Sequence, residues 1–139
     1  MVRTLAAALV LAVLLPACRR AAGPAEAYRT FAEAARAGNA EAVWGLLSEG
    51  SRRALDARAG ALAGKTPPGV VPASGRELVL GDLARAAPRV EKVLVLRESA
   101  DAAVVAVTIL GRGAPEEVPL VREGGAWRVV LPPLSSPAP

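Results

Sequence analysis

The spacing of apolar residues changes once along the chain, near Arg89, and this change restricts the fold more than any other feature. Before it, apolar side chains recur three and four residues apart, as in Tyr28, Phe31 and Ala35, which is the period of an amphipathic helix. After it, short apolar runs have the length and period of β-strands. Helices followed by strands predict an α+β domain in which the helices cover one face of an antiparallel sheet.

Local signals divide the first half of the domain into helices. Pro24 in the first turn and Gly38 after the last turn bound the first helix. Asn39 is the expected N-cap of a second, short helix, and Ser51 is the expected N-cap of a third. A loop rich in proline and glycine follows over 65–73.

Ser74 and Glu77 form a capping box, which predicts a fourth helix that runs to Pro88. A competing interpretation makes residues 78–80 a short strand that ends at Gly81.

The second half predicts four strands, over 90–97, 102–110, 116–122 and 126–131. Their short connections indicate an antiparallel meander. The second strand is apolar on both faces and is therefore expected in the centre of the sheet. Pro119 has no N–H to donate, so its position is expected at an edge or a bulge. Trp127 alternates with Val129 and Leu131 and is expected to be buried.

The N-terminus has the layout of a secretion signal. Arg3 precedes an unbroken apolar run over residues 5–15. Eleven apolar residues form a helix of roughly 16 Å, far short of the roughly 30 Å hydrocarbon core of a bilayer. We therefore expect the segment to direct export and not to remain as a membrane span.

The run ends in Leu15-Pro16-Ala17-Cys18, which resembles the bacterial lipobox. The resemblance implies cleavage after residue 17 and a diacylglyceryl group on Cys18, usually with an N-acyl chain such as palmitate. Several acyl chains, at about 0.8 kcal/mol per buried CH₂, make membrane attachment lasting. Cys18 is the only cysteine, so a disulfide within the chain is excluded. The alternative is an ordinary cleaved signal with an incidental cysteine.

The residue that follows Cys18 bears on which membrane holds the protein. Arg19 is not the aspartate that retains some lipoproteins at the inner membrane, which favours the outer membrane and a domain facing the periplasm. Arg19 and Arg20 could each add about 1 kcal/mol of attraction to anionic headgroups, or they could be solvated tether residues.

The charge balance is mild, because removal of residues 1–17 takes away Arg3 and no acid and lowers the formal net charge from +4 to +3. Basic and acidic residues alternate along the chain, and aromatic residues make up 3%. No nucleic-acid partner is expected.

The expected organisation is a signal peptide at 1–17, a lipidated tether at 18–23, one domain at 24–131 and a disordered tail at 132–139. The tail consists of Pro, Ser, Ala and one Leu and has little to bury. The 122 residues left after cleavage suffice for one domain with a hydrophobic core.

Two segments carry a family resemblance. The run Tyr28–Leu47, in which Gly38-Asn39-Ala40-Glu41 joins two helices, resembles the opening of the NTF2-like (cystatin-like α+β cone) superfamily. The segment 120–129, a glycine turn followed by Trp127-Arg128-Val129, is similar to the closing hairpin of that superfamily. The resemblance implies N-terminal helices packed on a curved antiparallel sheet of about four strands, although the superfamily often has more strands. Many small bacterial lipoproteins of unknown function share this plan.

The sequence offers little catalytic chemistry. It contains no histidine and no usable cysteine, so Ser-His-Asp, Cys-His and histidine–metal sites are not available. It also lacks a phosphate-binding glycine motif, and no metal or cofactor is expected. Enzymes of the resembled superfamily use a carboxylate, often with Tyr or His, inside the cone; the candidates here are Asp82, Asp101 and Tyr28. A predicted turn for Asp101 and a predicted helix for Asp82 favour solvated acids.

Four aromatic residues, Tyr28, Phe31, Trp44 and Trp127, are candidates to line an apolar cavity between helices and sheet, and filling of the core is the competing role. Two functions remain. The preferred one is a non-catalytic envelope lipoprotein whose domain binds a protein partner or a small apolar ligand. The other is a carboxylate-based isomerase or dehydratase, which requires a buried carboxylate with a raised pKa.

Overall fold

The computed structural model describes residues 21–132 of the 139-residue chain. Within the fourth helix it leaves the side chains of Leu80 and of residues 82–86 undescribed. The predicted secretion signal, Cys18 and residues 133–139 of the predicted tail lie outside the described residues.

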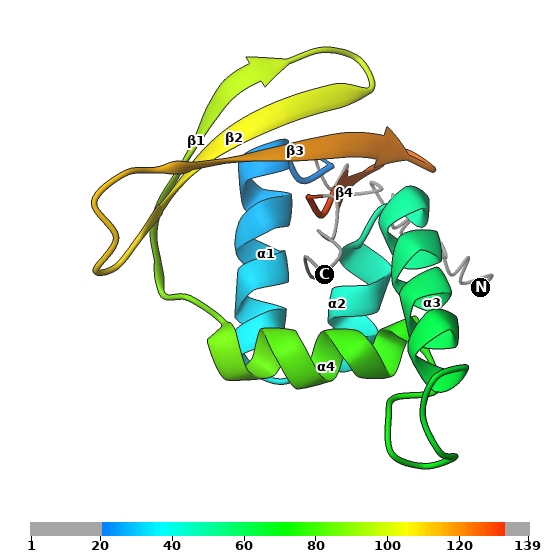
Figure 1. The fold of residues 1–139 in the computed structure, drawn as a ribbon. Helices are drawn as coiled ribbons and strands as arrows, with labels where there is room; N and C mark the ends of the chain where they lie inside the picture. Colours follow the sequence, from blue (N-terminus) through cyan, green and yellow to red (C-terminus); the bar gives the residue numbers. More distant parts are fainter. Residues whose placement is uncertain (1–20, 133–139) are drawn as a thin grey trace, which may run out of the picture.

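Four helices precede four strands in the described part of the chain, which confirms the predicted α+β order (Figure 1). The helices are α1 (Pro24–Arg36), α2 (Ala40–Leu46), α3 (Glu49–Ala63) and α4 (Gly75–Ala86). The strands are β1 (Val90–Glu98), β2 (Ala102–Ile109), β3 (Glu116–Glu123) and β4 (Ala126–Val129).

The boundary between α1 and α2 is the one that the sequence predicts. Gly38 has a φ of 66°, a conformation that glycine adopts without a steric penalty. The Asn39 side chain then accepts a hydrogen bond from the Ala42 N–H at 3.1 Å and caps α2. The chain therefore turns sharply, and α2 packs beside α1.

The N-cap of α3 is Ser48, and the prediction of Ser51 for this role is wrong. The Ser48 hydroxyl accepts a hydrogen bond from the Ser51 N–H at 3.1 Å. Gly50, which the prediction treats as a break before the helix, lies inside its first turn. The capping acceptor at Ser48 compensates for the low helix propensity of this glycine.

Residues 78–80 belong to helix α4, so the competing strand interpretation is wrong. The Ser74 hydroxyl accepts a hydrogen bond from the Glu77 N–H at 3.3 Å, and the Glu77 carboxylate accepts one from the Ala73 N–H at 2.8 Å. These contacts form the predicted capping box, except that Glu77 binds the N–H of Ala73 instead of the N–H of the N-cap residue Ser74.

The strands form one antiparallel sheet in the order β1–β2–β3–β4, as the short connections predict. β2 lies between β1 and β3, which confirms its central place. Pro119 lies opposite Val104 of β2 without a bulge. Its carbonyl accepts a hydrogen bond from the Val130 N–H at 3.0 Å, one residue beyond β4. β3 is not an edge strand. Pro119 lies where the β3–β4 ladder ends, so its lack of an N–H group costs no hydrogen bond within that ladder.

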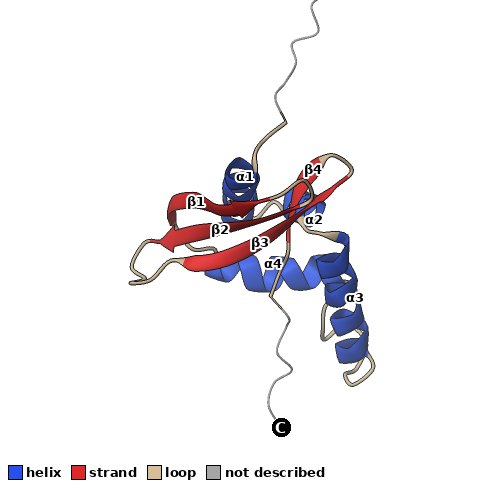
Figure 2. Cartoon of the chain, turned by 90° about the horizontal axis from the view of Figure 1, so that it is seen from above, coloured by secondary structure: helices blue, strands red, loops and turns tan. Residues whose placement is uncertain are grey.

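All four helices lie on one face of this sheet and leave the other face uncovered by any described element (Figures 1 and 2). The burial pattern of β2 shows the difference: Val105 and Val107 are fully buried toward the helices, whereas Val104 and Ala106 are partly exposed. The sheet is open and has β1 and β4 as its edges.

The two edges meet different neighbours. At β4, Leu47 forms a parallel bridge with Val129, and the Ser48 N–H donates to the Val129 carbonyl at 2.9 Å. At β1, the Arg29 guanidinium of α1 donates to the Val93 carbonyl at 3.3 Å. These contacts fix the helices to both edges of the sheet.

Candidate functional site

Cys18, the predicted lipidation site, lies outside the described residues, three positions before Ala21. Residues 21–23 are exposed and have no regular secondary structure, and α1 begins at Pro24. No helix in the described part is both long and apolar enough to cross a membrane. Only a short tether would separate a lipid on Cys18 from the domain.

Three of the four aromatic candidates belong to one hydrophobic core. Tyr28 and Phe31 lie on α1, with their ring centroids 5.9 Å apart and their planes at 40°. Trp127 lies on β4, is 6% exposed and faces the helices, as its alternation with Val129 predicts. The Arg122 guanidinium lies 5.8 Å from the centroid of the Trp127 ring at the margin of this core. Packing within this core accounts for all three rings.

Trp44 is separate from them, half-buried at the side of α2. The Arg76 guanidinium of α4 lies 5.8 Å from its ring centroid and forms an ion pair with Glu41 at 2.7 Å. A groove of about 420 Å³ opens beside Trp44, with Asp56 and Ser74 among its lining residues. The structure therefore does not place the four aromatic candidates around one cavity.

The polar groups of this groove are used to join helices. The Asp56 carboxylate of α3 accepts a hydrogen bond from the Gly75 N–H at the start of α4 at 2.9 Å. A Cβ atom on Gly75 would lie 2.6 Å from the backbone nitrogen of Asp56, so only glycine permits this approach. The groove is thus explained by the packing of α4 on α3.

One titratable group has a shifted pKa. Burial raises the pKa of the Tyr28 phenol above its ordinary value, and the negative charge of Glu116 raises it further. Glu116 lies on the same face of the sheet as the core, opposite Val107, and forms an ion pair with Arg112. Sequence reasoning did not single out Glu116, because its partner Tyr28 is far away in the chain.

The two acids named as catalytic candidates are not brought together with Tyr28 by any described contact. Asp101 is exposed and lies in the turn between β1 and β2, where its carbonyl accepts a hydrogen bond from the Arg122 N–H at 2.8 Å. Asp82 lies in α4, and its side chain is outside the described part. Among the side chains that the structure describes, the buried polar ones are Ser48 and Ser51.

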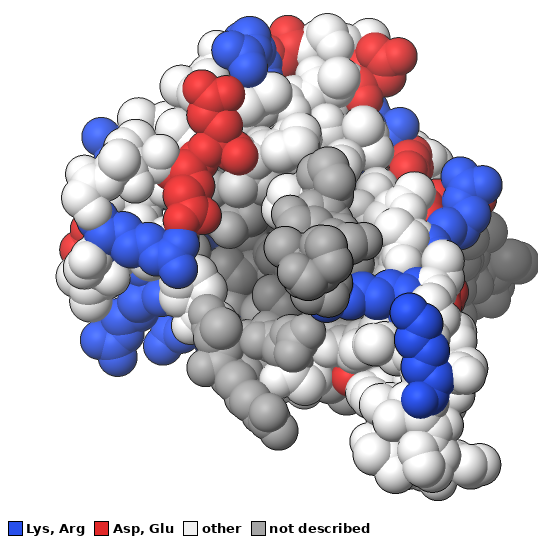
Figure 3. All heavy atoms as spheres, in the orientation of Figure 1, with Lys and Arg blue, Asp and Glu red and all other residues white. Residues whose placement is uncertain are grey.

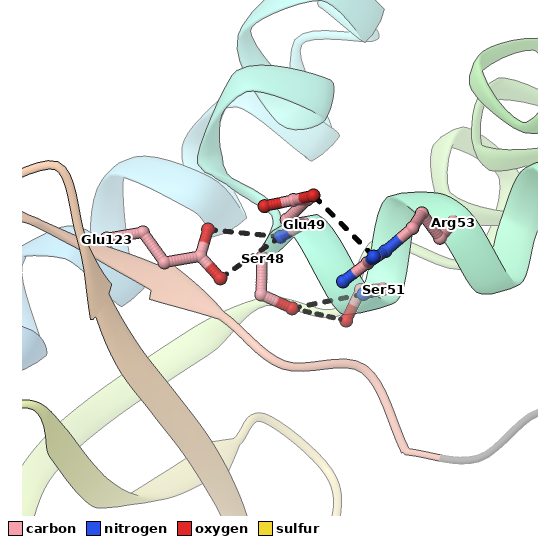
Figure 4. Close-up of polar contacts among 5 residues, drawn as sticks. All are labelled: Ser48, Glu49, Ser51, Arg53 and Glu123. Carbon is pink, nitrogen blue, oxygen red and sulfur yellow. Dashed lines mark hydrogen bonds and ion pairs between the residues drawn. The ribbon is translucent and has the colours of Figure 1, made fainter.

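These two serines hold the start of α3 against the end of the sheet (Figure 4). The Ser48 hydroxyl donates to the Ser51 hydroxyl at 2.9 Å, and the Ser51 hydroxyl accepts the Leu131 N–H at 2.9 Å. The Glu123 carboxylate of β3 accepts the Glu49 N–H at 3.0 and 3.2 Å. Every buried hydroxyl of this cluster has a structural partner, so the cluster is not a nucleophilic site.

The uncovered face of the sheet carries an apolar surface, which we call the outer face. Leu94 and Leu96 of β1 are 48% and 45% exposed. Partly or fully exposed apolar residues of the neighbouring strands continue it: Val104 and Ala106 of β2, and Pro119 and Val121 of β3. An ion pair between Arg97 and Glu117 at 3.3 Å links the first and third strands.

Sequence reasoning missed this surface, although the unbroken run from Val93 to Leu96 was a usable signal. A strand that covers a core on one side only should alternate, and four consecutive apolar residues indicate two apolar faces. Charged side chains, by contrast, are interspersed in sign over the side of the molecule drawn in Figure 3. The exposed leucines of β1 make the outer face the candidate interaction surface.

Comparisons with known proteins identify no relative: no protein-family model, no curated protein and no solved structure matches this chain. Among the side chains that the structure describes, no three Asp, Glu, His or Cys residues are grouped as a metal site would require.

Proposed function

We propose that this protein is a bacterial envelope lipoprotein, held to the membrane by a lipid on Cys18, whose domain is non-catalytic and binds a protein partner on its outer face. The lipobox resemblance of residues 15–18 supports the anchor. The outer face supports the binding role.

The observation that carries the binding role is the exposure of Leu94 and Leu96 beside the apolar residues of β2 and β3. Single exposed apolar residues are common on soluble proteins, whereas a contiguous set on three adjacent strands is typical of an interaction surface. An uncovered sheet face suits another protein better than it suits a small molecule, because small ligands bind in concave sites.

A small apolar ligand is the other form of the proposed binding role. It would require one cavity shared by the aromatic candidates, but Tyr28 and Phe31 are buried in the core. Trp44 and Trp127 line two separate open hollows. The protein partner is therefore the better-supported form.

The resemblance to the NTF2-like cone is part of the proposal. It is supported by the element order, in which the helix pair α1–α2 begins the domain sequence and the hairpin β3–β4 ends it. The open four-stranded sheet with helices on one face is compatible with a curved cone of that kind.

The alternative function, a carboxylate-based isomerase or dehydratase, finds its best support in Glu116, whose charge acts on Tyr28. The Glu116 side chain is 48% exposed and paired with Arg112. A catalytic base of this type is expected to be buried in a dry cavity. The exposure of Glu116 and its pairing with Arg112 therefore favour the non-catalytic binding role.

The test is photo-crosslinking in bacterial cells with a photoreactive amino acid at Leu94. Val70 supplies the matched control, because it is an apolar residue, 67% exposed, in the loop between α3 and α4. We expect a light-dependent adduct of defined mass from position 94 and none from position 70. We also expect Leu96→Glu to abolish the adduct at 94 while the protein stays folded. Equal adducts at both positions, or none at 94, would contradict a partner on the outer face.

A further inference from the structure

A partly open hollow of about 270 Å³ lies where the tether joins the domain. Ala21 and Ala22 of the tether form one wall, and Leu46 of α2 forms another. Gly125 at the β3–β4 turn and Arg128 of β4 complete its rim, with the Trp127 ring among its lining residues. We call this surface the tether end of the domain.

The length of the tether sets how far this surface can be from a membrane. Ala21 is three residues after Cys18, so the two Cα atoms are at most about 11 Å apart, at 3.8 Å per residue. The headgroup region of each leaflet is roughly 5–8 Å thick, from the difference between the whole bilayer and its hydrocarbon core. A lipid on Cys18 would therefore hold the wall of the hollow within or just above the headgroups.

Basic side chains gather at the same end. Arg122 is exposed above the Trp127 ring, and Arg128 reaches the carbonyl of Gly45 in α2 and keeps further N–H donors. Arg19 and Arg20 directly precede the tether wall in the sequence. Guanidinium groups pair with phosphate in bidentate geometry, and each basic residue near an anionic surface contributes about 1 kcal/mol. The nearby Glu123 carboxylate is engaged by the Glu49 N–H.

We propose that the tether end is a membrane-binding surface, which lies on anionic phospholipid headgroups and so fixes the orientation of the domain. Arg122 and Arg128 contact lipid phosphates, and the apolar hollow faces the membrane interface. The outer face then remains free for a protein partner. This inference rests on the proposed lipidation of Cys18.

The experiment uses the full protein, purified with its lipid from bacterial membranes and reconstituted in vesicles of phosphatidylglycerol and phosphatidylethanolamine. Lipidation consumes the Cys18 thiol, which is the only one in the chain, so one introduced cysteine can be labelled alone. A polarity-sensitive fluorophore is attached in separate variants at Ala126→Cys on the tether end, Leu96→Cys on the outer face and Val70→Cys on the α3–α4 loop. Headgroup-level nitroxide lipids then report contact with the membrane by quenching.

We expect quenching and a blue shift for the label at 126, and neither for the labels at 96 and 70. Arg122→Gln should reduce quenching at 126 in anionic vesicles, whereas Arg53→Gln on α3 should not. High salt should mimic Arg122→Gln, because it screens exposed charges.

The possible outcomes distinguish a failure of the proposed orientation from a failure of the lipid anchor. Lipidated protein whose label at 126 is not quenched, or whose label at 96 is quenched more, overturns this orientation and leaves the anchor intact. Protein whose mass shows no lipid at Cys18 overturns the anchor and the orientation with it.

Discussion

The Asp56 carboxylate in the middle of α3 accepts a hydrogen bond from the backbone N–H of Gly75, the first residue of α4, at 2.9 Å. One helix thus supplies an acceptor for an N–H group that has no partner inside the first turn of another, and the glycine permits backbone contact between them. This contact closes the long loop over 65–73 and sets the position of α4 beneath the sheet (Figure 1).

Gly75→Ala should therefore destabilise the domain. The added Cβ would lie 2.6 Å from the backbone nitrogen of Asp56 and 2.7 Å from the carbonyl carbon of Leu55, so α4 must move. Overpacking of this kind costs about 1–3 kcal/mol of unfolding free energy. Gly81→Ala is the matched control in the same helix, where nothing lies within 4 Å, and it should stabilise by about 0.5–1 kcal/mol. Urea denaturation measures both, and equal effects would disprove the close α3–α4 contact.

Trp127→Ala should cost about 3–5 kcal/mol of unfolding free energy, the range for loss of a large aromatic side chain from a core. The ring is 6% exposed, and the Arg122 guanidinium packs over it. Leu96→Ala removes an exposed apolar side chain from the same sheet and should cost less than about 1 kcal/mol. A loss below about 1 kcal/mol for Trp127→Ala would contradict the register of β4.

The phenol of Tyr28 should lose its proton only above the ordinary tyrosine pKa of 10.0, because burial and the negative Glu116 both disfavour the phenolate. The unfolded chain loses this proton first as pH rises. The stability that Tyr28 contributes is thus fully present below the unfolded pKa and is lost as pH rises through the folded pKa.

Glu116→Gln should lower the pKa of Tyr28 without returning it to 10.0, since burial is the larger cause. Tyr28 is the only tyrosine, so the ultraviolet absorbance of tyrosinate reports this single group. Glu117→Gln, at the next position but on the outer face, should leave the titration unchanged. An unchanged titration in Glu116→Gln would show that the carboxylate does not act on the phenol.

Local signals in the sequence predicted most of the fold. Caps and turn residues lie within a few positions of the backbone groups that they satisfy, so Asn39, Ser74 and Gly38 could be interpreted correctly. The prediction of the α3 cap failed because Ser48 and Ser51 both fit the local pattern. The choice between them depends on contacts from the far end of the domain sequence: Val129 binds the Ser48 N–H, and the Leu131 N–H binds the Ser51 hydroxyl.

The candidate site was less predictable, because it depends on which face of the sheet the helices cover. β2 is apolar on both faces, so its sequence does not tell Val104 from Val105. Pairing with β1 and β3 places Leu94, Val104 and Pro119 on the same face, and only the packing of α1 on the opposite side leaves them exposed. The effect of Glu116 on Tyr28 likewise needs the assembled sheet.

Metabolic labelling of bacterial cells with a palmitate analogue, followed by membrane fractionation and intact mass, tests the lipid anchor at Cys18 directly. We predict that the wild-type chain starts at residue 18, carries the label and fractionates with the membrane. We predict none of these three properties for Cys18→Ala, because only the thiol can accept the diacylglyceryl group. Equal labelling of Cys18→Ala and wild type, or a wild-type protein without lipid mass, would show that Cys18 does not carry the anchor.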